Sequence, residues 1–310
     1  MTRVAVVVVT HGDAGGLLAR CRRAGRAEAP DSDLVVVDNG SGAADTSGRI
    51  PEVTRSAGGR LLSVDNRGYG AAANAGVAHV DTSVASGEAT ADAVDVVVLL
   101  NDDVVVEPGC VRRLAVALDA EGVGAAQPML VTLDVEPSEV NSLGVAIDRF
   151  GAGSDIGAGE DPDLVPIEVG DLDVFTGGAV AFRAGYLADL GGFDERFFLY
   201  YEDVDLARRG SERGWRYRVV PAARAGHARS ASTASLGDRR RQLIERNRLW
   251  CVARHGTRRE VARAVGRSVR RLRHAPRRVH ARALLAGLGG VPSRRSERRR
   301  AARTQTGVRA

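Results

Sequence analysis

The chain has 310 residues, and 44% of them are hydrophobic, which suits one large α/β domain or one domain with an appendage and excludes global disorder. The net charge of +5 hides a split: residues 238–310 carry 23 arginines against 4 acids, while the first 237 residues carry 21 against 35. Three cysteines at irregular spacing exclude a disulfide framework or a zinc knuckle and favour a reducing compartment, and no apolar run reaches the ~20 residues of a membrane span.

Short apolar runs with many β-branched residues predict buried parallel strands in the first half of the chain. Polar residues directly follow three of these runs: Thr10-His11 after Val4–Val9, Asp38-Asn39 after Leu34–Val37, and Asn101-Asp102-Asp103 after Val94–Leu100. Further strands are expected at 60–64 and 123–126, with helices over 15–29, 70–80 and from Pro108 to about Ala120. Strands that alternate with helices predict a doubly wound sheet, in which ligands lie beyond the carboxyl ends of the strands.

Beyond residue 130 the regular alternation of predicted strands and helices is lost. Residues 133–173 are rich in Gly, Asp and Pro and predict irregular strands and loops, and Trp215–Val220 is expected to be the last strand, ended by Pro221. From about Ser235 the chain is Arg-rich and helical, with a break at 289–292 and a disordered end. We therefore expect a domain over 1–237, with a nucleotide-binding half over about 1–128 and an acceptor half over about 129–237, and a basic extension over 238–310.

The carboxylates Asp102 and Asp103 stand next to each other after Asn101 at a predicted strand end. Adjacent carboxylates repel unless a cation lies between them, and a hard divalent metal with oxygen ligands meets that need while it also binds a diphosphate. The alternative is a polar turn that leads into the helix at Pro108.

Asp38 lies in the segment Val-Asp-Asn-Gly-Ser at the end of the second strand, where a carboxylate can accept a hydrogen bond from a nucleobase or a ribose. A simple Asp-Asn-Gly turn is the equal alternative. Asn66 and Gly68 belong to a polar loop before a helix, and glycines in such a place let backbone amides approach a phosphate.

Glu202, Asp203 and Asp205 follow the aromatic stretch 197–201. A carboxylate against an apolar wall can have a raised pKa and act as a general base, whereas acids in a first helical turn are also favoured by the helix dipole. His227 follows the last predicted strand, and a lone His is more often structural than a metal ligand.

Six segments occur in one order along the chain: Val-Val-Val-Thr-His at 7–11, Val-Asp-Asn-Gly-Ser at 37–41, Asn-Arg-Gly-Tyr-Gly-Ala-Ala-Ala-Asn at 66–74, Leu-Leu-Asn-Asp-Asp at 99–103, Thr-Gly-Gly-Ala at 176–179, and Gly-Gly-Phe-Asp-Glu-Arg-Phe-Phe-Leu-Tyr-Tyr-Glu-Asp-Val-Asp-Leu at 191–206. Together they resemble the family 2 inverting glycosyltransferases of the GT-A fold, most closely the rhamnosyl- and galactofuranosyl-transferase-like members. The resemblance spans about residues 4–248, and its last segment is the most specific. It implies an α/β fold with a mostly parallel Rossmann-like sheet flanked by helices, here with an Arg-rich helical C-terminal extension.

The resemblance also implies a role for each matching residue. Asp203 would be the general base, with Glu202 as its rival and Asp205 structural. Asp103 and His227 would bind Mg²⁺ or Mn²⁺. The donor side would consist of Thr10, Asp38, Asn66, Gly68, Asn101 and Asp102, with Asp38 accepting a hydrogen bond from N3 of uracil or thymine. The acceptor side would consist of Thr176, Gly177 and Gly178. The metal motif often has an acid where this chain has Asn101, which suggests looser metal binding.

The implied reaction moves a sugar from a UDP- or dTDP-linked donor, such as rhamnose or galactofuranose, to a hydroxyl of a glycan or lipid-linked acceptor, in cell-wall or polysaccharide biosynthesis. Two alternatives remain: a sugar-phosphate nucleotidyltransferase, whose Gly-rich first loop is missing at 10–13, and an inactive sugar- or lipid-binding module of the same fold. The basic extension suits an anionic membrane surface, or it is a solvated helical appendage. Nucleic acid is the less favoured partner because the extension lacks stacking aromatics. The expected location is the cytoplasm, with the inner face of the membrane as an option.

Overall fold

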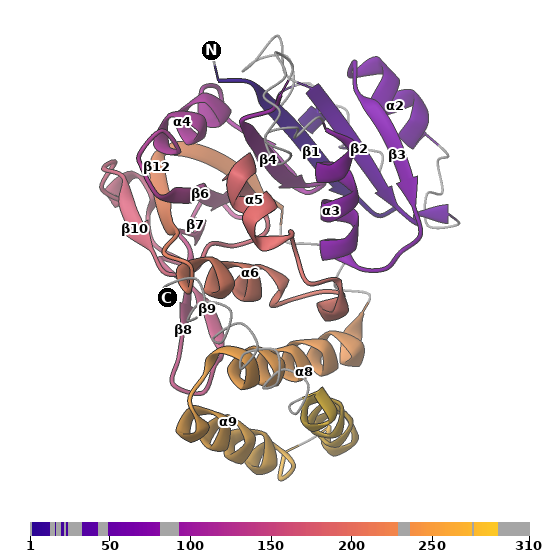
Figure 1. Cartoon of the computed structure of the whole chain (residues 1–310), viewed down its shortest axis with the longest axis vertical. Helices are drawn as coiled ribbons and strands as arrows, with labels where there is room; N and C mark the ends of the chain where they lie inside the picture. Colours follow the sequence, from indigo (N-terminus) through magenta and orange to yellow (C-terminus); the bar gives the residue numbers. More distant parts are fainter. Residues whose placement is uncertain are drawn as a thin grey trace, which may run out of the picture. The chain divides into compact units, whose positions relative to one another are not determined.

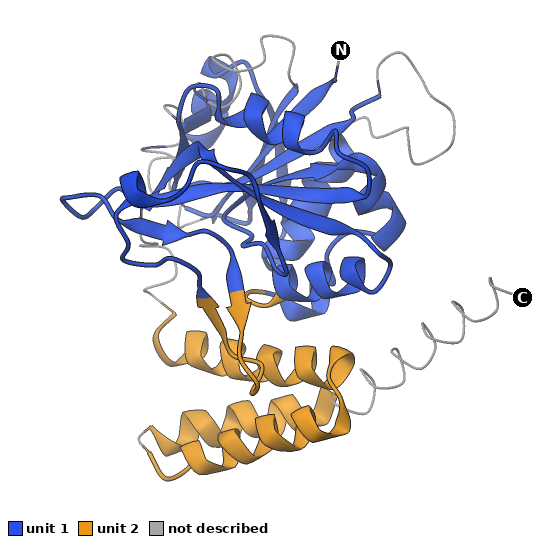
Figure 2. Cartoon of the chain, turned by 90° about the vertical axis from the view of Figure 1, so that its left-hand side faces the viewer, with its two compact units in different colours: residues 1–145, 155–198, 202–232 blue, residues 146–154, 199–201, 233–310 orange. Residues whose placement is uncertain are grey.

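The computed structural model describes residues 2–12, 16, 20, 21, 23, 33–42, 49–80, 93–228, 236–274 and 276–290. The chain forms two compact units, and each is assembled from separate stretches of sequence (Figure 2). The first unit comprises residues 1–145, 155–198 and 202–232, and the second comprises 146–154, 199–201 and 233–310. The predicted boundary at residue 237, between a transferase domain and a basic extension, stays a prediction. Most of the predicted helix over 15–29 and the chain end after Pro292 lie outside the described residues.

A ten-stranded sheet forms the centre of the first unit (Figure 1). Its main path, in spatial order, is β10 (Gly170–Leu172), β12 (Arg216–His227), β6 (Val123–Thr132), β11 (Ala179–Arg183), β4 (Val96–Asn101), β1 (Val4–Thr10), β2 (Asp33–Asn39) and β3 (Arg60–Val64), with β5 (Val104–Val106) on β12 and β7 (Val140–Ser142) on β6. The strands β3, β2, β1 and β4 are all parallel, as predicted. The other half is mixed, because β11 runs antiparallel to both of its neighbours while β6 and β12 are parallel to each other.

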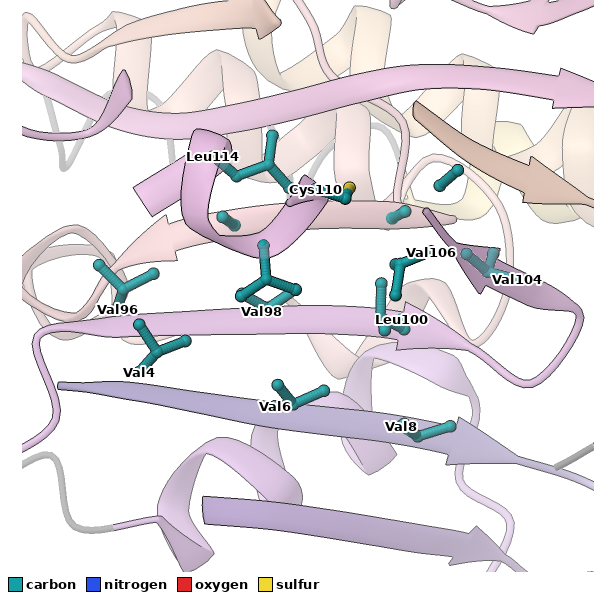
Figure 3. Close-up of a cluster of buried hydrophobic side chains, with 14 of the residues drawn as sticks. Val4, Val6, Val8, Val96, Val98, Leu100, Val104, Val106, Cys110 and Leu114 are labelled. Atoms are coloured by element: carbon teal, nitrogen blue, oxygen red, sulfur yellow. The ribbon is translucent and has the colours of Figure 1, made fainter. Parts of the chain in front are cut away.

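Helices cover both faces of this sheet. They are α2 (Ile50–Ser56), α3 (Tyr69–His79), α4 (Cys110–Ala117), α5 (Ala184–Leu190) and α6 (Glu202–Ser211), with 3-10 turns at Pro162–Leu164 and Glu195–Phe197. Alternate side chains of a strand point to opposite faces, so the strands between two helical layers are continuous apolar runs. On one face, side chains from β1, β4 and β5 meet those of α4 in a buried cluster that includes Val4, Val6, Val8, Val96, Val98, Leu100, Val104, Val106, Cys110 and Leu114 (Figure 3).

The helix α3 lies on the opposite face and approaches the sheet closely. A Cβ atom on its Gly76 would lie 2.5 Å from a methyl of Val7 and 2.8 Å from one of Val37, so that position has no room for a side chain. The rest of its inner surface consists of Gly70 and buried alanines. This close approach fixes where α3 begins, and therefore where the loop before it lies.

Three predicted boundaries are wrong, and two helices of the first unit are not predicted at all. The helix α4 begins at Cys110 rather than Pro108, because Gly109 is left-handed, with φ +80°. The strand β12 does not end at Pro221: it continues to His227 through a register shift between Val220 and Arg224, which removes the need for a ladder hydrogen bond at the proline. β6 extends over 123–132 instead of 123–126, and α2 and α5 have no predicted counterpart.

The second unit contains α8 (Gly237–His255), α9 (Arg258–Arg271) and a further helix over 277–290. The strands β8 (Val145–Ile147) and β9 (Gly153–Asp155) pair as a separate two-stranded sheet. Arg248 is only 1% exposed and donates two hydrogen bonds to the Glu245 carboxylate, at 2.7 and 3.0 Å, while Arg271 donates a third at 2.6 Å. Burial opposes the charge of Glu245, but Arg248, Ser268 and Arg271 together outweigh it and lower the pKa of Glu245.

The second unit also contains a strained stretch of backbone at residues 199–201. Tyr200 and Tyr201 have φ values of +71° and +70°, a region that non-glycine residues seldom occupy. Asn247 of α8 donates from its Nδ2 atom to the carbonyl oxygens of Leu199 at 2.8 Å and Tyr200 at 2.7 Å. Tyr201 donates from its hydroxyl to the carbonyl of Gly151 at 3.0 Å. These bonds hold a conformation that the backbone alone disfavours.

None of the described helices is both long enough and apolar enough to cross a membrane. All three cysteines, Cys21, Cys110 and Cys251, are buried free thiols, and burial raises the pKa of Cys21 to about 12.

Candidate active site

The carboxyl ends of β2, β1 and β4 lie side by side, because the parallel register pairs Thr10 with Asp38 and Val9 with Asn101. Asp102 follows β4 and turns back toward β1, where one of its oxygens accepts from the Thr10 hydroxyl at 2.8 Å and from the His11 amide at 3.2 Å. Burial raises the pKa of Asp102. The strand-end clusters that the sequence singles out therefore form one continuous polar edge.

Asp38 and the loop 65–68 meet at the next position along this edge. One oxygen of Asp38 accepts from the Ser41 amide at 2.9 Å and closes a tight turn through Gly40. A Cβ atom on Gly40 would lie 2.8 Å from the Asn66 nitrogen, so the turn and the loop are in contact. The Asn66 side chain accepts from the Gly68 amide at 3.1 Å. Asp38 thus holds a turn, as its alternative interpretation expects, and Asn66 holds a second turn beside it.

His227 and Asp103 are adjacent because β12 pairs antiparallel with β5, which places His227 opposite Val104. The Nε2 atom of His227 lies 3.2 Å from Oδ1 of Asp103, and the two side chains are 19% and 15% exposed. On the far side of the ring, Nδ1 lies 2.8 Å from the Asn141 side-chain oxygen. With the ring proton on Nδ1, His227 donates to Asn141 and the Nε2 lone pair faces the Asp103 carboxylate; with the proton on Nε2, the ring donates to Asp103 instead.

This pair suits a divalent cation. Within the described part of the chain, Oδ1 of Asp103 has no hydrogen-bond partner, and neither does Oδ1 of the nearby Asn101. A nitrogen lone pair and a carboxylate oxygen that face each other repel, and a cation between them removes the repulsion. The described residues contain no group of three or more His, Cys, Asp or Glu side chains arranged around a metal, so among them Asp103 and His227 form a pair rather than a complete cluster.

The segment Thr176–Gly178 joins this pair to the acidic cluster of α6. The Gly177 amide donates to Oδ2 of Asp203 at 2.9 Å, and the Gly178 carbonyl accepts from the Asn101 amide at 3.0 Å. A Cβ atom on Gly178 would lie 4.0 Å from both the Asn101 side chain and the His227 ring. Asp203 and the Asp103–His227 pair therefore lie on two sides of one short glycine segment.

Glu202 and Asp203 occupy the first turn of α6 but differ in accessibility. Glu202 is 6% exposed, and among the described residues its Oε2 atom has no hydrogen-bond partner. Burial, with the charge of Asp203, raises the pKa of Glu202 to about 8. Asp203 is only half-buried, and burial raises its pKa while the amides of Gly177 and Val204 oppose that rise. Asp205 is fully buried and bonds Arg209 at 2.9 Å, which is a structural role.

The family model described as glycosyltransferase-like family 2 matches residues 2–250, most of the chain. The chain belongs to this family. A curated relative, N-acetylglucosaminyl-diphospho-decaprenol L-rhamnosyltransferase of Mycobacterium tuberculosis, is 41% identical over 58 residues in two strains. That match spans 19% of this chain and 19% of the relative, so it covers about a fifth of either protein.

Solved structures of glycosyltransferases share the fold of this family 2 member. GalNAc-T7 with UDP, GalNAc and Mn²⁺ superposes with a TM-score of 0.60 at 16% identity, over 82% of this chain and 48% of that one. S. aureus TarS 1–349 gives a TM-score of 0.51 at 11% identity, over 97% and 92% of the two chains. The mannosyltransferase PcManGT of Pyrobaculum calidifontis, with GDP-Man and Mn²⁺, gives 0.51 at 19%, over 93% and 86%. The predicted GT-A fold is confirmed.

Three site-lining residues of this family 2 chain are absent from the sequence prediction. Asn141 orients His227, and Gln127 accepts from the Thr176 amide at 2.8 Å. Tyr69 donates from its hydroxyl to the Gly177 carbonyl at 2.7 Å. The sequence does contain a signal for Gln127, which is a single amide side chain between apolar residues. Such an amide, fully buried here, needs polar partners.

Proposed function

We propose that this protein transfers a sugar from a UDP- or dTDP-linked donor to a hydroxyl of a glycan or lipid-linked acceptor, with inversion at the anomeric carbon. The observation that supports this most is the placement of Asp203 and of the Asp103–His227 pair on two sides of the Thr176–Gly178 segment. A base and a site for the diphosphate are the two functions that such a transfer requires in one place.

The donor side is the polar edge at the ends of β2, β1 and β4. Asp38 would accept from the imide of uracil or thymine, and Thr10, Asn66 and Gly68 would line the nucleotide pocket. Asp102, held by Thr10 and the His11 amide, would lie near the donor sugar. Uracil and thymine present the same imide edge, so both nucleotide classes suit Asp38.

Asp103 and His227 would hold Mg²⁺ or Mn²⁺, with Asn101 beside them. When bound, the ion offsets the negative charge that develops on the nucleoside diphosphate as it leaves. With the ion bound, Asn141 would accept from Nδ1 of His227 and leave the Nε2 lone pair for the ion. The Mn²⁺ in the titles of the GalNAc-T7 and PcManGT structures supports this part of the proposal.

Asp203 would act as the general base. It accepts the proton of the acceptor hydroxyl as that oxygen attacks the anomeric carbon, and the bond to the diphosphate oxygen breaks on the opposite face, which inverts the centre. The Gly177 and Val204 amides, at 2.9 and 2.7 Å, favour the ionised form that a base needs. Asp203 is accessible to an acceptor in a way that the buried Glu202 is not.

Two measurements test this function. Thermal-shift and donor-hydrolysis screens against UDP- and dTDP-sugars, with Mn²⁺ and with chelator, should show metal-dependent stabilisation by one nucleotide class, because a ligand of the native state raises its stability. We expect Asp203→Asn to keep that stabilisation and lose transfer, while Asp119→Asn, at an exposed position after α4, keeps both. Turnover by Asp203→Asn would refute the base. Stabilisation without any turnover in the wild type would favour an inactive binding module.

The basic extension would bring the enzyme to an anionic membrane surface. Val269 of α9 is 49% exposed, and Leu285 and Leu288 of the next helix are 71% and 40% exposed. Arg278 and Arg282 are also exposed and share one helix face with Leu285. Exposed apolar side chains beside arginines suit the boundary between anionic headgroups and acyl chains.

Sedimentation with vesicles tests this surface. The protein should sediment with phosphatidylglycerol vesicles and not with phosphatidylcholine vesicles. Arg278→Glu with Arg282→Glu should reduce sedimentation, whereas Arg55→Glu with Arg112→Glu, an equal change of charge on exposed positions of the first unit, should reduce it less. Equal losses in the two variants, or no sedimentation at all, would remove the lipid surface.

A further inference from the structure

Tyr69 connects two parts of the site that the proposed chemistry treats separately. It directly follows Gly68, at the start of α3, and its backbone amide donates to the Phe198 carbonyl at 2.7 Å. Its hydroxyl donates to the Gly177 carbonyl, also at 2.7 Å. One residue thus bonds the segment that leads into α6 and the glycine segment on which Asp203 rests.

The contact between this loop and Phe198 leaves little freedom. Gly68 has φ +102°, and a Cβ atom on it would lie 2.1 Å from the Phe198 carbonyl oxygen. Phe198 has φ +67° and ψ −61°, the values of a classic γ-turn, which is rare and strained. The Tyr69 amide accordingly bonds a carbonyl whose position is already constrained, and the ring of Tyr69 is held at a fixed point.

Gly177 needs an external constraint. Glycine has no Cβ, so its backbone torsions are less restricted than those of any other residue. Its carbonyl accepts from Tyr69, and its amide donates to Oδ2 of Asp203 at 2.9 Å. The Tyr69 hydroxyl holds the carbonyl of Gly177 and Asp203 holds its amide, so the two hydrogen bonds together restrict the two backbone torsions that lie between them.

We propose that Tyr69 is a positioning residue of the transferase site, which acts through Gly177 to fix the direction of the Asp203 carboxylate. This inference rests on the proposed function of Asp203. Because Tyr69 follows Gly68 in the chain, the same residue ties the predicted nucleotide loop to the predicted base.

Tyr69 is not itself a suitable proton acceptor. Burial raises its pKa well above 10, and the carboxylates of Glu202 and Asp203 raise it further. Its proton is already donated to the Gly177 carbonyl. A purely structural role is the competing account, since the ring packs edge-on against Phe193 at 6.3 Å between centroids. Replacement by phenylalanine separates the two accounts, because it keeps the ring and removes only the hydroxyl.

Tyr69→Phe should therefore be compared with Tyr186→Phe. Tyr186 is buried, and its hydroxyl also donates to a main-chain carbonyl, that of Leu206 at 3.1 Å. We expect similar losses of melting temperature in the two variants. With the UDP- or dTDP-sugar that the wild type turns over, Tyr69→Phe should lower kcat roughly 10- to 100-fold with little change in donor KM, as misplacement of a reacting group does. Tyr186→Phe should keep kcat.

The pH profile provides a readout that a structural role would not change. Asp203 is faced by Glu202 on its own helix, by Asp155 of β9 and by Tyr69. If the Gly177 amide turns away, the carboxylate loses a donor and its pKa rises. The acidic limb of kcat/KM should then move to higher pH in Tyr69→Phe only. An unchanged kcat and an unchanged limb would overturn the proposal.

Titration by ¹³C NMR keeps the inference testable if the proposed transfer itself fails. The carboxyl signal of Asp203 can be assigned by its loss in Asp203→Asn. Its pKa should rise in Tyr69→Phe and remain as in the wild type in Tyr186→Phe, whether or not any donor is turned over. A wild-type-like titration in Tyr69→Phe would refute the positioning role, whereas absence of turnover with a shifted titration would refute only the transferase assignment.

Discussion

The buried Glu202 should make the stability of the first unit depend strongly on pH. A carboxyl whose pKa rises from 4.5 to about 8 on folding binds its proton more tightly in the folded state. The contribution of Glu202 to stability is therefore greatest at low pH, and it is lost as pH rises from about 4.5 to about 8. The full loss is about 5 kcal/mol, at 1.36 kcal/mol for each tenfold change in proton affinity. Glu202→Gln should abolish most of this dependence, because the amide cannot ionise.

Two tryptophans make the measurement specific to one unit. Trp215 lies in the first unit and Trp250 in the second, so Trp250→Phe leaves Trp215 as the reporter of unfolding in urea. Unfolding free energies at pH 5, 6, 7 and 8 should decrease steadily in this background and stay nearly level after Glu202→Gln. The control is Glu212→Gln, an exposed position just after α6, which should keep the slope. An unfolding free energy that does not change with pH in Trp250→Phe would refute this prediction. So would an equally steep decrease after Glu202→Gln is added.

The same substitution separates the two candidate bases, since Glu202→Gln should retain transfer if Asp203 is the base. Asp205→Ala leaves Arg209 without its buried partner, which should cost about 3–5 kcal/mol in urea unfolding; a loss below about 1 kcal/mol, the value of an exposed pair, would contradict this. Asn141→Ala releases the His227 ring and should weaken Mn²⁺ binding about 10- to 100-fold, as measured by electron paramagnetic resonance titration. Unchanged Mn²⁺ affinity would show that Asn141 does not orient the ligand.

The strands β1, β2 and β4 of the parallel half were predictable because both of their faces are covered. Val4–Val9 and Leu34–Val37 are unbroken apolar runs, and β1 extends beyond its run by one residue and β2 by three. The same reasoning failed at Pro221, where the rule that proline ends an interior strand holds for a regular ladder and not for one with a bulge. α2 was missed because seven residues are too few to show a helical period.

Part of the site follows from topology, and part depends on distant contacts. Thr10, Asp38 and Asp102 could be grouped in advance, because the carboxyl ends of adjacent parallel strands share one edge. The adjacency of His227 and Asp103 depends on an antiparallel pairing with the short strand β5, which no local pattern predicts, and only the family resemblance pointed to it. Tyr69 escaped detection because its partners are backbone atoms far away in the sequence.

The division of the second unit into three stretches has a consequence for synthesis. Residues 146–154 and 199–201 leave the ribosome long before α8 does, although α8 carries the side chains that bond them. The carbonyls of Leu199 and Tyr200 gain their donor only when Asn247 has emerged. The left-handed turn that directly precedes Glu202 is thus completed late, by a part of the chain made after the last strand of the large sheet. A nascent chain arrested before α8 would hold every strand of the large sheet and still lack the donor that fixes this turn.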